Sequence, residues 1–198
     1  MNEHMNGPRP EERERKIISK KGVSIDIRSN TDSALHGDKI SLGVGGMEKL
    51  KNVDYAFAKE GTEKGDIAVG KEGTLIYSRV SGESVAKELK YAGTDEQKEE
   101  KLLLIEKLLK TPEVADIHQI EVLPEFQGKG IAAALLDVAE WDIKDTNKLA
   151  FSTARVLFDN PDREKILGLF ERSGFKKFYR PRGFNNPAHW IVIRENTK

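Results

Sequence analysis

Residues 117–136 read IHQIEVLPEFQGKGIAAALL, a pattern that predicts a half-buried strand, a turn with two glycines and the first turns of an apolar helix. Gly128 and Gly130 have no Cβ, so the backbone of this turn can approach a ligand closely. The first N–H groups of a helix lack intrahelical partners and lie at the positive end of the helix dipole. The stretch therefore predicts a site for a phosphate or pyrophosphate at the start of the helix.

Taken alone, the glycine turn has two balanced interpretations, because glycines also end strands and begin helices for structural reasons. Two known phosphate motifs do not fit. The dinucleotide fingerprint requires G-x-G-x-x-G after the first strand of its unit, with an acidic residue farther along the chain. A P-loop requires Ser or Thr after its lysine, whereas Lys129 is followed by Gly130.

The stretch that begins with V-L-P at Val122 resembles motif A of the GCN5-related N-acetyltransferases (GNAT), whose signature Q/R-x-x-G-x-G/A follows a strand ending in V-x-P. Gln127, Gly130 and Ala132 stand at the signature positions. The resemblance implies that acetyl-CoA is the acyl donor, with its pyrophosphate on the backbone N–H groups of the turn and its pantetheine arm paired with the end of the strand. The residues implied to bind acetyl-CoA are Val122, Leu123, Gln127, Gly128, Lys129, Gly130, Ile131 and Ala132.

The resemblance further implies an N-acetyltransferase in which a primary amine attacks the acetyl group directly. LFERSGF, residues 169–175, is similar to L-Y-E-K-x-G-F, which ends motif B of the family. Many members carry a tyrosine acid where this chain has Phe170, so Tyr179 is the candidate that remains for protonating the leaving thiolate. Because phenylalanine gives no proton, the alternative is a non-catalytic module that binds acyl-CoA for regulation. Asn160 and Pro161 predict the start of the motif B helix, as N-cap and first residue.

An attacking amine has to be neutral, so a base must accept its proton directly or through water. His118 lies on the predicted strand four residues before Val122, where some members of the family carry a catalytic histidine. Asp116 lies on the same face if the strand is regular, and it would orient the imidazole. Both side chains also suit a strand edge without any catalytic role. Glu121 is the second candidate base, provided that burial raises the pKa of its carboxyl group.

Composition excludes several other classes of protein. The 198 residues include 33 basic and 33 acidic side chains, so zero net charge argues against nucleic acid as a partner. The absence of cysteine excludes disulfides and thiolate metal sites, and with four histidines we expect no bound metal. No apolar run approaches the roughly 20 residues of a membrane span, and residues 9–21 are charged where a signal peptide would be apolar. We therefore expect a cytoplasmic protein, and the resemblance allows a homodimer.

Along the chain, residues 1–15 have the composition of a flexible tail, and residues 16–198 are predicted to form one domain. The predicted fold is mixed α/β, with a twisted, mostly antiparallel sheet of about six or seven strands and helices on both faces. Helical residues 82–110 form an insertion before the motif A strand, whereas the family places its variable helices earlier. We expect strands at 23–28, 39–44, 66–70, 74–80, 149–156, 175–180 and 188–194, the third and fourth forming a hairpin and the last two another.

One face of the second helix in this insertion is predicted to be buried. Leu102, Ile105, Leu108 and Leu109 recur at helical spacing, opposite the charged residues Glu99, Glu100 and Lys107. This pattern predicts that the four apolar residues pack against the sheet.

Overall fold

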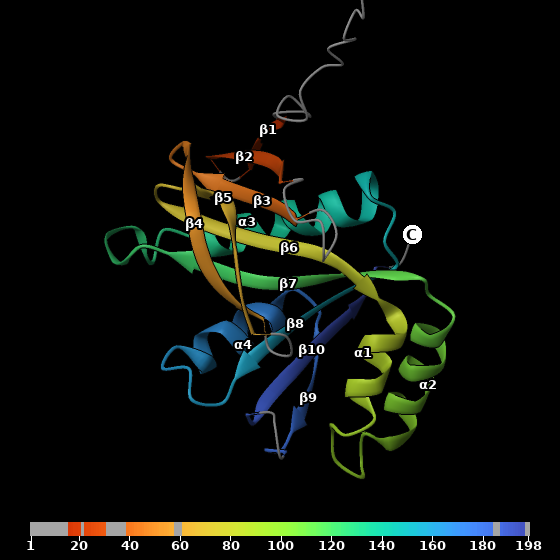
Figure 1. The fold of residues 1–198 in the computed structure, drawn as a ribbon. Helices are drawn as coiled ribbons and strands as arrows, with labels where there is room; N and C mark the ends of the chain where they lie inside the picture. The colour runs from red at the N-terminus through yellow and green to blue at the C-terminus, as the bar shows by residue number, and fades with distance from the viewer. Residues whose placement is uncertain (1–15, 21, 31–38, 58–60, 184–186, 197–198) are drawn as a thin grey trace, which may run out of the picture.

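The computed structural model describes residues 16–20, 22–30, 39–57, 61–183 and 187–196. The expected tail at residues 1–15 lies outside this range. The described chain forms one large sheet with helices on both faces and a separate two-stranded hairpin (Figure 1). Mixed α/β architecture is therefore confirmed.

The large sheet contains eight strands in the order β1-β2-β3-β6-β7-β8-β10-β9, rather than about six or seven. Neighbouring strands pair antiparallel except β7 and β8, which pair parallel. The sheet is therefore mostly antiparallel, as predicted. Its strands are β1 (Lys16–Lys20), β2 (Val23–Asn30), β3 (Lys39–Val44), β6 (Gly73–Ser81), β7 (Glu113–Val122), β8 (Phe151–Leu157), β9 (Lys176–Arg180) and β10 (His189–Glu195).

The remaining two strands, β4 (Met47–Phe57) and β5 (Gly61–Gly70), pair only with each other. The predicted hairpin between β5 and β6 is therefore wrong. Lys71 N–H donates to Gly46 C=O and Glu72 N–H to Val44 C=O, so the β5–β6 turn bonds to the β3–β4 turn. Both strands leave the main sheet together at this point.

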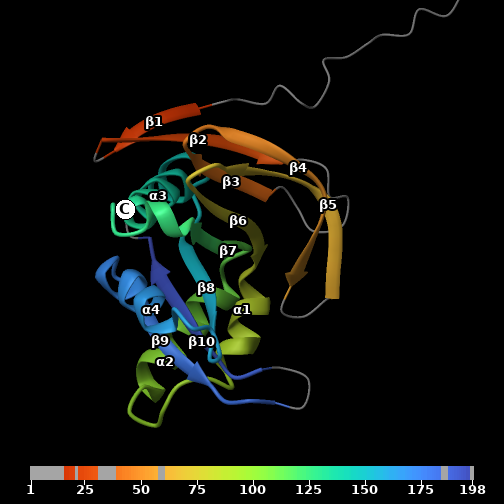
Figure 2. The same cartoon turned by 90° about the vertical axis from the view of Figure 1, so that its left-hand side faces the viewer.

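Glycine permits the close crossing of backbones where β4 and β5 leave the sheet. A Cβ on Gly70 would lie 2.2 Å from Gly73 O, and a Cβ on Gly43 would lie 2.8 Å from Gly70 Cα. The neighbours of Gly43 in β3 face α3 (Ile131–Trp141), so Gly43 faces the opposite side of the sheet. The β4–β5 hairpin therefore lies on the side of the sheet where α1 (Gly82–Leu89) lies (Figure 2).

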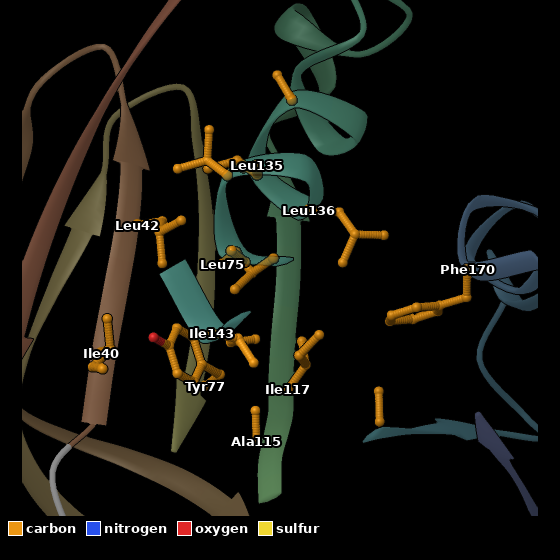
Figure 3. Packing of buried hydrophobic residues seen from close by; sticks show 14 of the residues in the cluster. Ile40, Leu42, Leu75, Tyr77, Ala115, Ile117, Leu135, Leu136, Ile143 and Phe170 are labelled. Carbon is orange, nitrogen blue, oxygen red and sulfur yellow. The ribbon is translucent and has the colours of Figure 1, made fainter. Parts of the chain in front are cut away.

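Two apolar cores hold the helices to the two faces of the sheet. On one face, α3 and α4 (Arg163–Arg172) pack on the inward side chains of β2, β3, β6, β7 and β8 (Figure 3). On the other, α1 and α2 (Lys98–Leu109) pack on β7, β8, β9 and β10. Within β7, Val114 joins the second core and Ala115 the first, as the two-residue period of a strand requires. Helices on both faces and the insertion before β7 are thus confirmed.

The stripe predicted for α2 is partly wrong. Leu104, Ile105 and Leu108 are buried against the sheet, while Leu102 and Leu109 are about half exposed. The buried face is rotated relative to the prediction because the run LLLI offers two competing apolar stripes. Packing against α1 and the sheet selects the stripe that contains Leu104.

Candidate functional site

The turn before α3 has the geometry that the sequence predicted. A 3₁₀ turn at Pro124–Phe126 ends β7, and the backbone then passes through Gly128 at φ 76° and Gly130 at φ 79°. Both values lie in the left-handed region, which glycine adopts without strain. Gly130 is the N-cap of α3, so the first N–H groups of the helix begin directly after it. A Cβ on Gly128 or Gly130 would meet no atom within 4 Å, which leaves open space in front of the turn.

Two side chains of the turn fold back beside this space. The Gln127 side-chain amide donates to Val122 C=O at 3.1 Å. The ammonium group of Lys129 lies 4.9 Å from the centre of the Phe126 ring, a cation–π distance. A positive charge therefore stands next to the helix start, which favours an anion there.

The edge of β7 that faces away from β6 is open at its carboxyl end. β8 pairs with β7 only through residues 115–117. Leu123 N–H donates to Glu72 C=O, so Val122 and Gly73 form a non-hydrogen-bonded antiparallel pair. The N–H and C=O of Val122 therefore point away from β6, toward the gap that the divergence of β7 and β8 opens.

A pocket of about 180 Å³ lies at this divergence. Its wall includes His118, Arg155, Asn160 and Phe170. Of the three predicted catalytic residues, His118 lines the pocket, whereas Asp116 and Glu121 are not part of its wall. The complete lining is Ile117, His118, Gln119, Ile120, Ala154, Arg155, Val156, Asn160, Ile166 and Phe170.

A β-bulge sets the position of His118. The register between β6 and β7 pairs Tyr77 with Ile117 and Ile76 with Gln119, so His118 is the extra residue. Its Nε2 lies 2.6 Å from Ser78 Oγ, and its Nδ1 lies 3.8 Å from Asp116 Oδ2. Asp116 and His118 therefore lie on the same face of the sheet, as the sequence indicated, although the strand is not regular.

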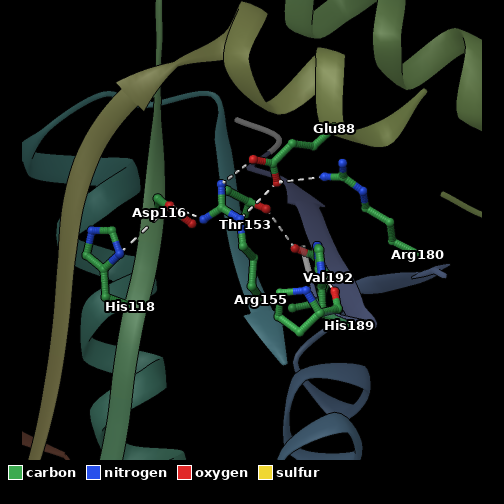
Figure 4. A network of polar contacts seen from close by, with 9 residues as sticks. Glu88, Asp116, His118, Thr153, Arg155, Arg180, His189 and Val192 are labelled. Atoms are coloured by element: carbon green, nitrogen blue, oxygen red, sulfur yellow. Dashed lines mark hydrogen bonds and ion pairs between the residues drawn. The ribbon is translucent and has the colours of Figure 1, made fainter. Parts of the chain in front are cut away.

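Asp116 itself is engaged by an arginine (Figure 4). Arg155 Nη1 lies 2.5 Å from Asp116 Oδ2, and Arg155 donates from Nε and Nη2 to the two oxygens of Glu88 at 2.8 and 3.1 Å. Arg180 Nη1 lies 4.0 Å from Glu88. The side chains of Glu88 and Asp116 are 4% and 3% exposed, so these ion pairs are shielded from water.

The surroundings of His118 keep its imidazole neutral near neutral pH. Burial lowers the pKa of His118, the Asp116 carboxylate opposes this, and the positive charges of Arg155 and Lys39 lower the pKa further. The pKa of the Arg155 guanidinium is raised by Asp116 and Glu88, although burial acts in the opposite sense. A neutral imidazole is the form that accepts a proton.

Glu121 does not meet the condition set for it. Its residue is exposed, and its carboxylate accepts a hydrogen bond from the Gln119 side chain at 2.7 Å. The burial on which its role as a base depends is therefore not found. The structure does not bring Glu121 together with His118 and Asp116 in a hydrogen-bonded group.

The motif B segment departs from prediction at its start. α4 begins at Arg163 with Asp162 as N-cap, so the prediction of Asn160 as cap is wrong. Asn160 Oδ1 instead accepts from Asp162 N–H at 2.8 Å and closes a turn at the pocket wall.

Phe170 is 2% exposed, and its ring packs edge-on against Phe175 at 4.9 Å between centroids. Tyr179 packs on Trp190 at 5.1 Å and does not line the pocket.

Sequence reasoning missed Ser78, Glu88 and Arg155. Arg155 stands in FSTARVLF, a strand that is otherwise mostly apolar and small, and a charge in such a strand requires a buried partner. That signal indicates a partner but does not identify it, because Glu88 is 67 residues away in sequence.

Two further findings concern metal ions and membranes. The described part of the chain contains no group of three or more His, Asp or Glu side chains arranged to hold a metal ion. Among the same residues, no helix is long and apolar enough to cross a membrane.

Comparison with known proteins gives one family match. Residues 93–175 match the model of the acetyltransferase (GNAT) family. This segment contains α2, β7, the glycine turn, α3, β8 and α4. No curated protein sequence matches the chain.

Several solved structures are similar at the level of the fold. NAA60 of Arabidopsis thaliana in complex with acetyl-CoA has 14% identity and a TM-score of 0.48, over 86% of this chain and 98% of that one. Mutant spermidine/spermine N-acetyltransferase SpeG of Vibrio cholerae has 15% identity and a TM-score of 0.41, over 83% and 69%. The ribosomal-protein-S18-alanine N-acetyltransferase of Escherichia coli has 21% identity and a TM-score of 0.35, over 42% and 55%.

Proposed function

Because residues 93–175 match the model of the acetyltransferase (GNAT) family, we propose that the chain transfers the acetyl group of acetyl-CoA to a primary amine by direct attack. The observation that supports this most is the end of the β7–β8 pairing at residue 117, where His118 lines a pocket on the strand that leads to the glycine turn. β7 thereby carries a partly buried candidate base, a strand edge that is open at Val122 and, at its end, the proposed anion site.

The residues present fit acetyl-CoA as donor. The first N–H groups of α3 and the left-handed Gly128 and Gly130 suit a pyrophosphate, since a Cβ at either glycine would meet no atom of the described residues within 4 Å. The outward N–H and C=O of Val122 suit an extended, amide-containing arm that adds to the strand edge. The Gln127 side chain must release Val122 C=O for that pairing. When bound, the thioester supplies the acetyl group.

His118 is proposed as the base that accepts the proton of the amine. Its pKa is lowered mainly by burial, so the imidazole is neutral and ready to accept at neutral pH. Because Nε2 is paired with Ser78 Oγ, the proton arrives at Nδ1 or passes through the Ser78 hydroxyl. Asp116 Oδ2 lies 3.8 Å from Nδ1, so its negative charge offsets only part of the effect of burial on the pKa of this imidazole. Activity should therefore rise with pH along an acid limb whose midpoint lies below the ordinary pKa of histidine.

The alternative function is a non-catalytic module that binds acyl-CoA. Phe170 favours it, because a buried phenyl ring at the pocket wall gives no proton to a leaving thiolate. Tyr179 is turned into an aromatic cluster with Trp190, so it does not replace that acid in the described structure. On the acetyltransferase proposal, water at the open edge of the pocket protonates the thiolate.

The experiment measures acetyl-CoA binding and acetyl transfer separately. Calorimetry gives the affinity, and release of free thiol over a panel of primary amines gives turnover. Mass spectrometry of a cell extract incubated with labelled acetyl-CoA then identifies the acceptor. We expect His118→Gln to keep the affinity and to lower kcat by about 100-fold or more. Tight binding without turnover on any amine would instead establish the non-catalytic module.

A further inference from the structure

A buried chain of charges connects the helical insertion to the base. It runs from Glu88 in α1 through Arg155 in β8 to Asp116 in β7, and Arg180 of β9 lies 4.0 Å from Glu88 (Figure 4). Glu88 holds Arg155 through two hydrogen bonds from Nε and Nη2, which leaves Nη1 for Asp116. A guanidinium held by two nitrogens in this way has a fixed orientation.

α1 holds Glu88 firmly at the sheet. Ser81 caps the helix by accepting from Ser84 N–H at 3.2 Å, and Glu83 pairs with Lys87 one turn later. Val85, Ala86 and Leu89 are buried in the core between α1, α2 and the sheet, which sets the rotation of the helix. Glu88 therefore faces the sheet because its neighbours do.

The Asp116 carboxylate lies closer to Arg155 than to His118. Asp116 Oδ2 lies 2.5 Å from Arg155 Nη1 and 3.8 Å from His118 Nδ1. The shorter contact is a charge-assisted hydrogen bond, and the longer one is beyond hydrogen-bond distance. The carboxylate is thus held on the arginine and away from the imidazole, although both lie on the same face.

We propose that Arg155 is a positioning residue for the base: braced by Glu88, it binds the Asp116 carboxylate and keeps that carboxylate from pairing with the His118 imidazole. A free Asp116 would bind His118 and stabilise the protonated ring, which cannot accept a proton. The clamp formed by Glu88, Arg155 and Asp116 thereby keeps the base in its neutral, receptive form. The inference rests on His118 as the base of the proposed acetyl transfer.

The charged groups around His118 predict how its pKa should change when Arg155 or Glu88 is replaced. Asp116 on its own strand is negative, whereas Arg155 of β8 and Lys39 of β3 are positive, and Ser78 of β6 presents a hydroxyl. Removing Arg155 takes away a positive charge and frees the carboxylate, and both changes raise the pKa of His118. In Glu88→Gln the side-chain amide oxygen can still accept from Arg155, so the guanidinium stays on Asp116 while one negative charge is lost, and the pKa of His118 should fall or stay constant.

The direct test is an NMR titration of the His118 ring, assigned by comparison with His118→Gln. The variants are Arg155→Met, Glu88→Gln and the double variant Glu88→Gln/Arg155→Met. The double variant keeps the buried charge balanced, because it removes one carboxylate together with the guanidinium. Arg194→Met is the matched control, since Arg194 pairs with the buried Glu140 at 3.0 Å in a different part of the fold.

We expect Arg155→Met and the double variant to raise the pKa of His118 by roughly one unit. The acid limb of kcat/KM should move by the same amount, about a tenfold loss of activity on that limb. Glu88→Gln should not raise this pKa, and Arg194→Met should leave it unchanged. A folded double variant with an unchanged His118 pKa overturns the proposal. A shifted pKa in a protein that acetylates no amine supports the clamp and contradicts the proposed function.

Discussion

Replacing Gly130 with alanine separates the backbone role of this glycine from its role in binding. Gly130 has φ 79°, and an added Cβ would meet no atom within 4 Å. The cost to folding is therefore backbone strain alone, roughly 1–2 kcal/mol. Gly174 has φ 83° and equally open space, so Gly174→Ala should cost the same at a position outside the glycine turn.

The effect on binding should differ between the two glycines. The new Cβ at position 130 stands beside the first N–H groups of α3, where we propose that the pyrophosphate binds. Displacing one charge-assisted hydrogen bond costs about 1.5–3 kcal/mol. The Kd for CoA should therefore rise by about ten- to a hundredfold in Gly130→Ala.

Calorimetric titration with CoA and urea unfolding of both variants provide the assay. The expected result is a similar loss of unfolding free energy in both, with a loss of affinity in Gly130→Ala alone. An unchanged affinity in Gly130→Ala would refute the assignment of the turn to pyrophosphate. An equal loss of affinity in both variants would show that strain, rather than a blocked site, weakens binding.

Three further predictions concern buried side chains. Burial raises the pKa of Glu140, although the positive charge of Arg194 opposes this. The protonated carboxyl group therefore favours folding, and this contribution to stability is lost as pH rises through the folded-state pKa. Relative to wild type, the unfolding free energy of Glu140→Gln in urea should thus increase by on the order of 1 kcal/mol between pH 4 and pH 7. Tyr77 donates to Asp142 Oδ2 at 2.6 Å, so Tyr77→Phe should lower the unfolding free energy by about 1–3 kcal/mol without changing CoA affinity. Phe170→Tyr places a hydroxyl at the pocket wall and should raise kcat about tenfold; a fall in kcat would show that the thiolate is protonated from another direction.

The sequence predicted best where neighbouring residues determine the structure. β3 spans residues 39–44, as its alternating pattern indicated, and β9 and β10 pair as expected. The glycine turn follows from local chemistry as well, because only glycine adopts left-handed φ at no cost. The strand, the glycine turn and the start of α3 could therefore be predicted from one contiguous stretch.

Predictions of strand pairing and of the helix cap were wrong where contacts between different segments decide the local structure. Residues 66–70 and 74–80 look like a hairpin locally, but the bonds from Lys71 and Glu72 to the β3–β4 turn direct β5 to β4 instead. Likewise, Asn160 suits a helix cap by residue type, yet its side chain closes a turn two residues before the cap that forms. Local propensity gives each segment several choices, and tertiary contacts select among them.

The sequence by itself determined the strand, glycine turn and helix at residues 117–136, because their geometry depends on backbone freedom and on alternation between adjacent residues. Only the tertiary structure decided the surroundings of His118. A one-residue bulge against β6 sets the ring, and charges from α1 and β8 hold Asp116 away from it. Glu88 and Arg155 are 67 positions apart, and their attraction acts only once folding has removed the water between them.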